Sequence, residues 1–308
     1  MKDGIIIVDK PPEWTSHDVV AKLRGALKIK RVGHGGTLDP MATGVLPIFV
    51  GRATRAAQFC ESADKEYIAG LKLGIVTDTQ DTTGKILSEC QSTVSESELQ
   101  NTISNFLGAQ KQIPPMYSAI KQNGKKLYEL ARQGIEVERP SRDIFISEIE
   151  LLSGSHSVIA APEPQSPAEK GSIEGSDFLI RVACSKGTYI RTLCHDIGAS
   201  LGCGGVMSSL RRTAAGIFKI ENAVSLEQIL NHISENEYEK FLLPTDSIFS
   251  NFQSITLNEQ DTKKCKNGVS CHIKNTFDGK YRVYAPDGEF LMFAEVVGDT
   301  LKMIKGFY

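Results

Sequence analysis

Hydrophobic and polar positions follow two different periods along this chain, which predicts both strands and helices. Apolar residues at helical spacing follow a capping-box pattern at Thr15, Ser95 and Ser225 and predict helices that begin there. Short β-branched or alternating runs predict strands at residues 5–8, 45–50, 68–73, 143–152 and 178–184. The alternation shifts phase within 143–152, for which a β-bulge is one explanation.

Two stretches depart from this regular pattern. Residues 153–177 are rich in Ser, Pro and Gly and show no periodicity, so we expect a flexible insertion between two paired strands. From about residue 250 to residue 308 the runs are short, with hairpin turns expected at Asp278-Gly279 and Asp287-Gly288. This segment predicts a small β-rich domain.

The composition is that of an ordinary globular protein, with 41% hydrophobic and 23% charged residues. No apolar run approaches the ~20 residues that span a membrane. The seven cysteines are odd in number and include no C-x-x-C pair, which argues against a disulfide framework or a zinc site. We therefore expect a cytoplasmic protein with reduced thiols and no membrane contact.

Charge is segregated along the chain, although the formal net charge is only -2. Residues 1–60 carry nine Lys and Arg against five Asp and Glu, and residues 111–143 carry seven against four. Between them, residues 61–110 carry three against eight. Such segregation can present a positive face to phosphate groups. Chance clustering on a solvated surface would give the same counts.

The stretch from Gly33 to Pro47, GHGGTLDPMATGVLP, sets one acid among glycines and small or hydroxyl residues. Pro40 holds Asp39 out of the helical region, and glycine lets another molecule approach the main chain closely. These residues leave two interpretations open. One is a displayed, reactive carboxylate, and the other is a glycine-rich turn with an Asx-type hydrogen bond at Asp39.

This stretch resembles the signature of the TruB family of tRNA pseudouridine synthases, in which the aspartate of G-x-L-D-P-x-A-T-G is catalytic. Other segments resemble the same family, and these are D-K-x-Y at 64–67, T-D-T-x-D at 77–81, S-K-G-T-Y-I-R-T at 185–192, and L-G-x-G with L-R-R at 201–212. The D-K-P and T-S-H-D segments near residues 9–18 are similar to a family motif that packs beside the catalytic loop.

The resemblance covers nearly the whole chain and implies its architecture. Residues 1–249 would form the catalytic domain in the pseudouridine synthase fold. That fold is of the α+β class, with a mixed, mainly antiparallel sheet and flanking helices. Residues 121–142 would be an insertion that clasps tRNA, and residues 250–308 a β-rich, PUA-like RNA-binding domain. The family usually has a tight connection where this chain has residues 153–177.

The resemblance also implies catalytic roles for three residues. Asp39 would be the catalytic carboxylate, and Arg191 would pair with it and keep it ionised. Tyr67 would stack on the target base, and we take it as the candidate base for the C5 proton. Attack of Asp39 on the base, attack on the sugar and removal of a sugar proton all remain open. Without the resemblance, Arg191 would be interpreted as a structural ion-pair residue.

Three more residues would bind the substrate. Tyr189 would lie beneath the target base, and Leu210 would pack against it. His34 would fill the gap left by the flipped nucleotide or hold that nucleotide. Without the resemblance, His34 would be interpreted as a histidine that bonds its own loop.

The implied reaction converts uridine to pseudouridine at position 55 in the T-loop of tRNA, by base flipping. Substrate and product contain the same atoms, so no cofactor and no metal is expected. The implied partner is the tRNA T-arm stem-loop, bound by a monomer. One alternative is a non-catalytic tRNA-binding or tRNA-folding protein on the same scaffold. Another is a glycosidase-like hydrolase, which lacks a second acid in a comparable loop.

Overall fold

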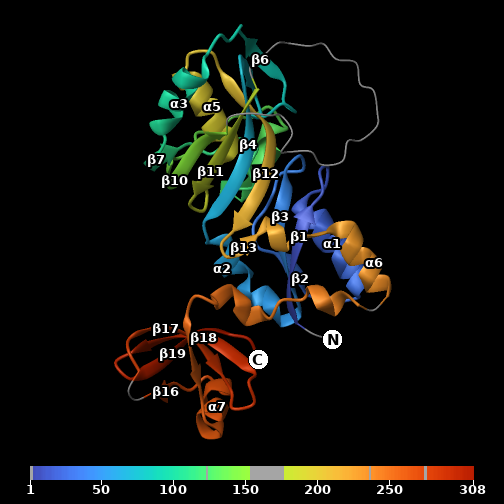
Figure 1. The fold of residues 1–308 in the computed structure, drawn as a ribbon, viewed down its shortest axis with the longest axis vertical. Helices are drawn as coiled ribbons and strands as arrows, with labels where there is room; N and C mark the ends of the chain where they lie inside the picture. Colours follow the sequence, from blue (N-terminus) through green and yellow to red (C-terminus); the bar gives the residue numbers. More distant parts are fainter. Residues whose placement is uncertain (1–2, 123, 153–176, 236, 274–275) are drawn as a thin grey trace. The chain divides into compact units, whose positions relative to one another are not determined.

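The structure, a computed structural model, describes residues 3–122, 124–152, 177–235, 237–273 and 276–308. The chain divides into two compact units, which are Met1–Ala63 with Ala215–Tyr308, and Asp64–Ala214 (Figure 1). The predicted insertion 153–177 lies outside the described residues, apart from Asp177. None of the described helices combines the length and the apolar character that crossing a membrane requires.

The first unit is built on two hydrophobic strands. β1 (Gly4–Lys10) pairs antiparallel with β3 (Thr43–Val50), and every residue of β3 is buried. β2 (Val32–His34) also pairs with β3, and the short β14 (Val224–Ser225) runs parallel to β1. The predicted strands at 5–8 and 45–50 are therefore confirmed, and they frame the loop that carries Asp39.

Two capped helices lie side by side in this unit, α1 (Ser16–Leu27) and α6 (Leu226–Ser234) (Figure 1). Each begins at a predicted capping box, in which the cap hydroxyl and the third helical residue bond each other's main chain. The remaining short elements are η1 (Gly51–Ala56), α2 (Ala57–Glu61), β13 (Phe218–Lys219), η2 (Ile220–Asn222), η3 (Tyr238–Phe241) and η4 (Thr245–Phe249).

The predicted small β-rich segment forms a five-stranded sheet in the order β15-β17-β18-β19-β16. Its elements are β15 (Gln253–Thr256), α7 (Glu259–Lys266), β16 (Cys271–His272), β17 (Gly279–Tyr284), β18 (Phe290–Val297) and β19 (Thr300–Gly306). Asp287-Gly288 lies in the β17–β18 hairpin, as predicted. The hairpin turn expected at Asp278-Gly279 is wrong, because Gly279 begins β17. A second hairpin turns instead at Gly298-Asp299, where both φ angles are positive, 52° and 59°.

The second unit has a sheet in the order β12-β4-β11-β10-β7, with α3 and α5 packed against it (Figure 1). The phase shift predicted in 143–152 is a register shift between Ile146 and Glu148, so the bulge is confirmed. The elements of the sheet layer are β4 (Lys65–Leu73), α3 (Glu96–Ser104), β7 (Gly108–Gln112), β10 (Arg142–Leu152), β11 (Asp177–Cys184), α5 (Ile190–Ser200) and β12 (Gly205–Ala215).

The other elements of the second unit are short, and they are β5 (Ile75–Thr77), β6 (Ile86–Glu89), β8 (Lys121–Gln122), β9 (Lys125–Lys126) and α4 (Leu127–Ala131). β5 pairs with β6, and β8 pairs with β9 in a small hairpin that leads into α4. This hairpin and helix fall within the predicted insertion 121–142. No disulfide links the seven cysteines, all of which are described.

Candidate active site

The loop that carries Asp39 is anchored from α1. The hydroxyl of Ser16 accepts a hydrogen bond from the Leu38 N–H at 2.9 Å and donates one to the Leu38 carbonyl at 3.3 Å. Ser16 is fully buried and is the first residue of α1, directly after the Thr15 cap. The capping box therefore determines where the helix begins. It also determines the position of the Ser16 hydroxyl, which holds Leu38, the residue before Asp39.

The residue after Asp39 is held from β1. Lys10 is 0% exposed, and its ammonium donates to the carbonyl oxygens of Pro11 at 2.8 Å, Trp14 at 2.6 Å and Pro40 at 3.0 Å. A buried lysine is costly unless its charge meets several acceptors. The main chain on both sides of Asp39 is thus fastened by the segments that the D-K-P and T-S-H-D resemblance assigned to packing beside the loop.

Asp39 itself is half-buried and lies outside any helix or strand. Its carbonyl accepts from the Ala42 N–H at 3.0 Å, which closes a turn through Pro40. Gly35 passes so close to the core that a Cβ there would lie 2.7 Å from the Cys60 sulfur. The glycines therefore permit close packing and sharp turning behind the carboxylate.

His34 is the last residue of β2 and lies at the start of the loop that carries Asp39. Its ring meets the exposed ring of His17 edge to face, with centroids 5.1 Å apart. His17 was not among the predicted site residues. The T-S-H-D segment at 15–18, which contains His17, was the sequence feature that could have identified it.

Tyr67 lies inside β4, as its third residue, rather than at the strand entrance. The prediction began the strand at residue 68, because the charged residues 64–66 masked its start. Tyr67 pairs with Val182 of β11 on one side. On the other side, the Thr213 hydroxyl bonds Glu66 at 2.6 Å, which aligns β12 with β4.

The alignment of β12 with β4 places two predicted residues on one sheet face. Glu66 of β4 contacts Thr213 of β12, and a Cβ at Gly70 would meet Ser208 and Ser209. Residue numbers thus rise along β4 as they fall along β12, so the two strands run antiparallel. Glu66 and Thr213 share one face, and alternation puts Tyr67 on the opposite face. Leu210 shares that opposite face, and both side chains are buried. The buried Arg212, opposite Tyr67, was quoted in the L-R-R segment but not predicted as a site residue.

Tyr189 and Arg191 stand at the corner between β11 and α5. Tyr189 has extended backbone angles and is the residue before the helix, which begins at Ile190. Its main chain is held by Gln112, whose amide nitrogen donates to the Tyr189 carbonyl at 3.0 Å. The Gln112 amide oxygen accepts from the Tyr189 N–H at 2.8 Å. Gln112 lies 77 positions away in the sequence and carried no signal that would have singled it out.

Arg191 is buried, and its guanidinium is held by two segments of the second unit. It donates to the Thr79 carbonyl at 3.3 Å and to the Tyr117 carbonyl at 2.9 Å. Its Nη1 also lies 3.9 Å from Oδ2 of the buried Asp81. The T-D-T-x-D segment at 77–81 therefore supplies a carboxylate beside Arg191.

The six predicted residues are divided between the units. Asp39 and His34 belong to the first unit, and Tyr67, Tyr189, Arg191 and Leu210 belong to the second. Hydrogen bonds fasten the main chain on both sides of Asp39, the main chain of Tyr189 and the guanidinium of Arg191. The meeting of all six in one cleft, with Arg191 beside Asp39, stays a prediction.

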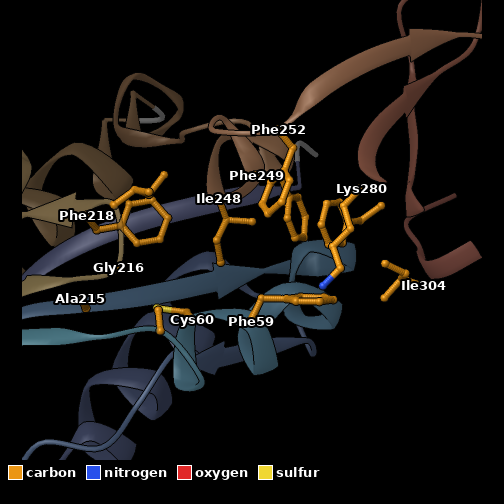
Figure 2. A pocket seen from close by; sticks show the side chains of 13 residues that line it. Phe59, Cys60, Ala215, Gly216, Phe218, Ile248, Phe249, Phe252, Lys280 and Ile304 are labelled. Carbon is orange, nitrogen blue, oxygen red and sulfur yellow. The ribbon is translucent and has the colours of Figure 1, made fainter. Parts of the chain in front are cut away.

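A cavity of about 280 Å³ lies elsewhere in the first unit (Figure 2). It is lined mainly by aromatic and aliphatic side chains, among them Phe59, Phe249 and Phe293. None of the predicted site residues lines it. Because it offers few polar groups, this cavity does not suit the proposed chemistry.

Among the described residues, the atoms of His232, Glu235 and Glu237 that could bind a metal all lie within 4.8 Å of one another. Both carboxylates are exposed, and Glu237 already bonds Lys240 at 3.1 Å. This group adjoins the end of α6 and contains none of the predicted site residues.

Comparison with known proteins adds a family. A model described as TruB family pseudouridylate synthase (N terminal domain) matches residues 24–190. A second, described as tRNA pseudouridylate synthase B C-terminal domain, matches residues 191–250. A Syntrophomonas wolfei protein named tRNA pseudouridine synthase B is 43% identical over 294 residues, covering 95% of this chain and 93% of that protein. A protein of the same name from Alkaliphilus oremlandii is 46% identical over 287 residues, covering 93% and 88%.

Solved structures agree on the fold. The chain superimposes on one from a Cbf5-Nop10-Gar1 complex with a TM-score of 0.71 and 26% identity, covering 99% of this chain and 85% of that one. A chain from an H/ACA RNP bound to a substrate RNA containing 2'-deoxyuridine gives a TM-score of 0.70 and 25% identity, with 99% and 85% covered. The predicted pseudouridine synthase fold is confirmed, and the chain belongs to the TruB family of pseudouridine synthases.

Proposed function

We propose that this protein isomerises uridine to pseudouridine at position 55 in the T-loop of tRNA, with Asp39 as the catalytic carboxylate. The relatives' printed name, tRNA pseudouridine synthase B, supports tRNA as the substrate. Within the chain, the observation that carries the proposal is the double anchoring of the Asp39 loop by Ser16 and Lys10. A carboxylate that must meet one sugar carbon benefits from a main chain that does not move.

The target uridine must first leave its stack, at a cost of a few kcal/mol. In the proposed complex, His34 fills the vacated gap or holds the turned-out nucleotide. The ring of Tyr67 stacks on the flipped base, which is worth ~1–3 kcal/mol. Tyr189 lies beneath the base, and Leu210 packs against it.

The chemistry then breaks one bond and forms another. The C1′–N1 bond of uridine breaks, and the ionised Asp39 acts as nucleophile or stabilises positive charge at C1′. The freed uracil turns, and C5 bonds to C1′. The C5 proton leaves to a base, for which Tyr67 is our candidate, and N1 gains a proton. Attack on C6, attack on C1′ and removal of a sugar proton all begin from the same ionised carboxylate.

Arg191 has the charge that this account requires. A guanidinium beside a carboxylate favours the ionised form of that carboxylate. Arg191 is held by carbonyl oxygens from Thr79 and Tyr117 and lies near Asp81, so its position is constrained. In the proposed site this constrained cation faces Asp39.

Two further regions would bind the RNA. In the insertion 121–142, Lys126 Nζ and Arg132 Cζ each lie 5.4 Å from the ring centroid of Tyr128. Lys121 and Lys125 are exposed on the same hairpin and are free to meet phosphates of the T-arm. Residues 250–308 would act as a PUA-like RNA-binding domain beside a catalytic domain at 1–249. The protein would work as a cytoplasmic monomer.

Tritium release tests the proposal. A tRNA transcript labelled with tritium at C5 of its uridines should release label stoichiometrically at one site. A transcript with cytidine at position 55 should release none. Tight tRNA binding with no release from the first transcript would contradict the proposal and favour a tRNA-folding protein. Free uracil as product would instead indicate a hydrolase.

A further inference from the structure

Gln112 makes an unusual contact with the site corner, because one side chain satisfies both main-chain groups of one distant residue. Its Oε1 accepts from the Tyr189 N–H at 2.8 Å, and its Nε2 donates to the Tyr189 carbonyl at 3.0 Å. The side chain is 3% exposed, so water does not replace either bond easily. Only an amide of this length offers a donor and an acceptor side by side.

The held residue is the one that sets the direction of α5. Tyr189 is extended, and helical geometry begins at Ile190, so a rotation at Tyr189 would swing the first turn of the helix. Its hydroxyl-bearing side chain makes no capping bond to that turn. Gln112 therefore fixes, from β7, the main chain of the residue before the helix, and it bonds none of the first-turn N–H groups that a capping side chain would accept from.

The same segment also reaches Arg191. Five residues after Gln112, the Tyr117 carbonyl accepts from Nη2 of Arg191 at 2.9 Å. On the far side of the corner, the Thr192 hydroxyl donates to the Gln80 side chain at 2.8 Å. Tyr189, Arg191 and Thr192 are thus each held by another segment, and Gln112 provides the contact at the residue before the helix.

We propose that Gln112 is a positioning residue for pseudouridine formation, which acts by holding the main chain of Tyr189 so that Tyr189 and Arg191 meet the target uridine. The inference rests on the proposed function for those two residues. Gln112 touches neither substrate nor reacting atoms. Its loss should therefore slow the chemical step and leave RNA affinity almost unchanged.

The matched variants are Gln112→Glu and Gln110→Glu. A carboxylate at 112 still accepts from the Tyr189 N–H but repels the Tyr189 carbonyl. Gln110 lies on the same strand, and its side-chain amide donates to the carbonyls of Asn105 and Leu107 in the preceding turn. Replacing it by Glu therefore controls for the added charge. Single-turnover tritium release and the dissociation constant for the T-arm stem-loop are measured on both variants, with rates normalised to RNA-binding-competent protein.

We expect Gln112→Glu to slow single-turnover release about tenfold or more at pH 8, because small misplacements of site groups are costly. RNA affinity should change less than about threefold, and Gln110→Glu should match the intact protein. Lowering the pH to 5.5 protonates a buried carboxyl and restores a donor, so the rate of Gln112→Glu relative to the intact protein should rise. Arg142, opposite Gln112 in the β7–β10 register, favours the ionised form of a carboxyl at 112 and opposes the effect of burial, so the ratio is followed at several pH values from 8 down to 5.5.

Equal rates for Gln112→Glu and the intact protein would overturn the inference, and so would a loss confined to RNA affinity. A rate deficit in Gln112→Glu that does not change with pH would also contradict it. These outcomes are distinct from failure of the proposed function, in which the intact protein itself would release no tritium.

Discussion

Asp81 and Arg191 form a buried ion pair, with Oδ2 of Asp81 3.9 Å from Nη1 of Arg191. The other carboxylate oxygen of Asp81 accepts from the Thr79 hydroxyl at 2.7 Å and the Thr83 hydroxyl at 2.6 Å. The carboxylate is therefore oriented by its own loop before it meets the guanidinium. Removing it leaves Arg191 buried with one opposite charge fewer.

Asp81→Ala should lower the free energy of unfolding by about 3 kcal/mol, because removing one partner of a buried ion pair leaves the other charge buried and uncompensated. It should also slow single-turnover tritium release about 100-fold, because Arg191 is no longer held in place. Urea unfolding and release assays measure the two effects. Glu89→Gln, at an exposed position of the nearby β6, is the control and should change neither by much. Full activity of Asp81→Ala would show that Arg191 does not depend on this carboxylate.

Ser16→Ala should slow catalysis without weakening RNA binding. The substitution removes both bonds to Leu38 and leaves its buried N–H without the Ser16 acceptor, at a cost of about 1–3 kcal/mol. Of the two anchors described above, the one from Lys10 to Pro40 then remains. A drop in the single-turnover rate with an unchanged dissociation constant is expected. Ser62→Ala, which removes an exposed bond to the Phe59 carbonyl, is the control. An unaltered rate for Ser16→Ala would contradict the anchoring role.

Gly35→Ala and Gly33→Ala should differ sharply in stability. A Cβ at Gly35 would lie 2.7 Å from the Cys60 sulfur and 2.8 Å from the Phe49 ring, whereas at Gly33 the nearest atom would be 3.9 Å away. Overpacking of this kind costs about 1–3 kcal/mol. Thermal and urea unfolding should show the loss for Gly35→Ala alone. Comparable stabilities would mean that the loop relaxes without cost.

The capping box of α1 predicts a pH dependence of stability. The Thr15 hydroxyl and then the Thr15 N–H donate to Asp18, and together they hold the pKa of this carboxyl below its usual value of 3.8. A lowered pKa in the folded state means that the stabilisation is complete above pH 3.8 and is lost as the pH falls through the lowered pKa. Asp18→Asn should therefore be less stable than the intact protein at pH 7, by an amount that shrinks below pH 4. A difference that stays constant across this range would contradict the assignment.

Local signals predicted much of the fold. The capping boxes at Thr15, Ser95 and Ser225 each begin a helix with both reciprocal bonds present. The phase shift near Ile146 marked a real bulge. These features depend on residues within a few positions of one another, and short-range physics determines them.

Long-range effects account for what the local signals missed. Glycine commonly ends a helix, yet the helix capped by Ser95, α3, stops at Ser104, and Gly108 begins β7 because that segment pairs with β10. Residues 114–119, all of which are described, form no strand. The main chain of that segment serves Arg191 instead, through the Tyr117 carbonyl.

The candidate site shows the same division. The glycine-rich stretch and the S-K-G-T-Y-I-R-T segment drew attention to Asp39, Tyr189 and Arg191. Ser16, Lys10 and Asp81, which hold the Asp39 loop and Arg191, lie in segments that the sequence had singled out. Gln112, which holds Tyr189, acts from a distant segment and carries no sequence pattern of its own. A contact across 77 positions depends on the tertiary fold, and one sequence offers no local sign of it.

The most direct test of the central claim is single-turnover tritium release by Asp39→Asn on a tRNA transcript with labelled uridine at position 55. The amide keeps the size of the side chain and removes its charge. We predict a fall of more than about 10³-fold in the rate, with RNA affinity retained and with Asp143→Asn, an exposed aspartate, as active as the intact protein. Turnover by Asp39→Asn at the rate of the intact protein would contradict the account.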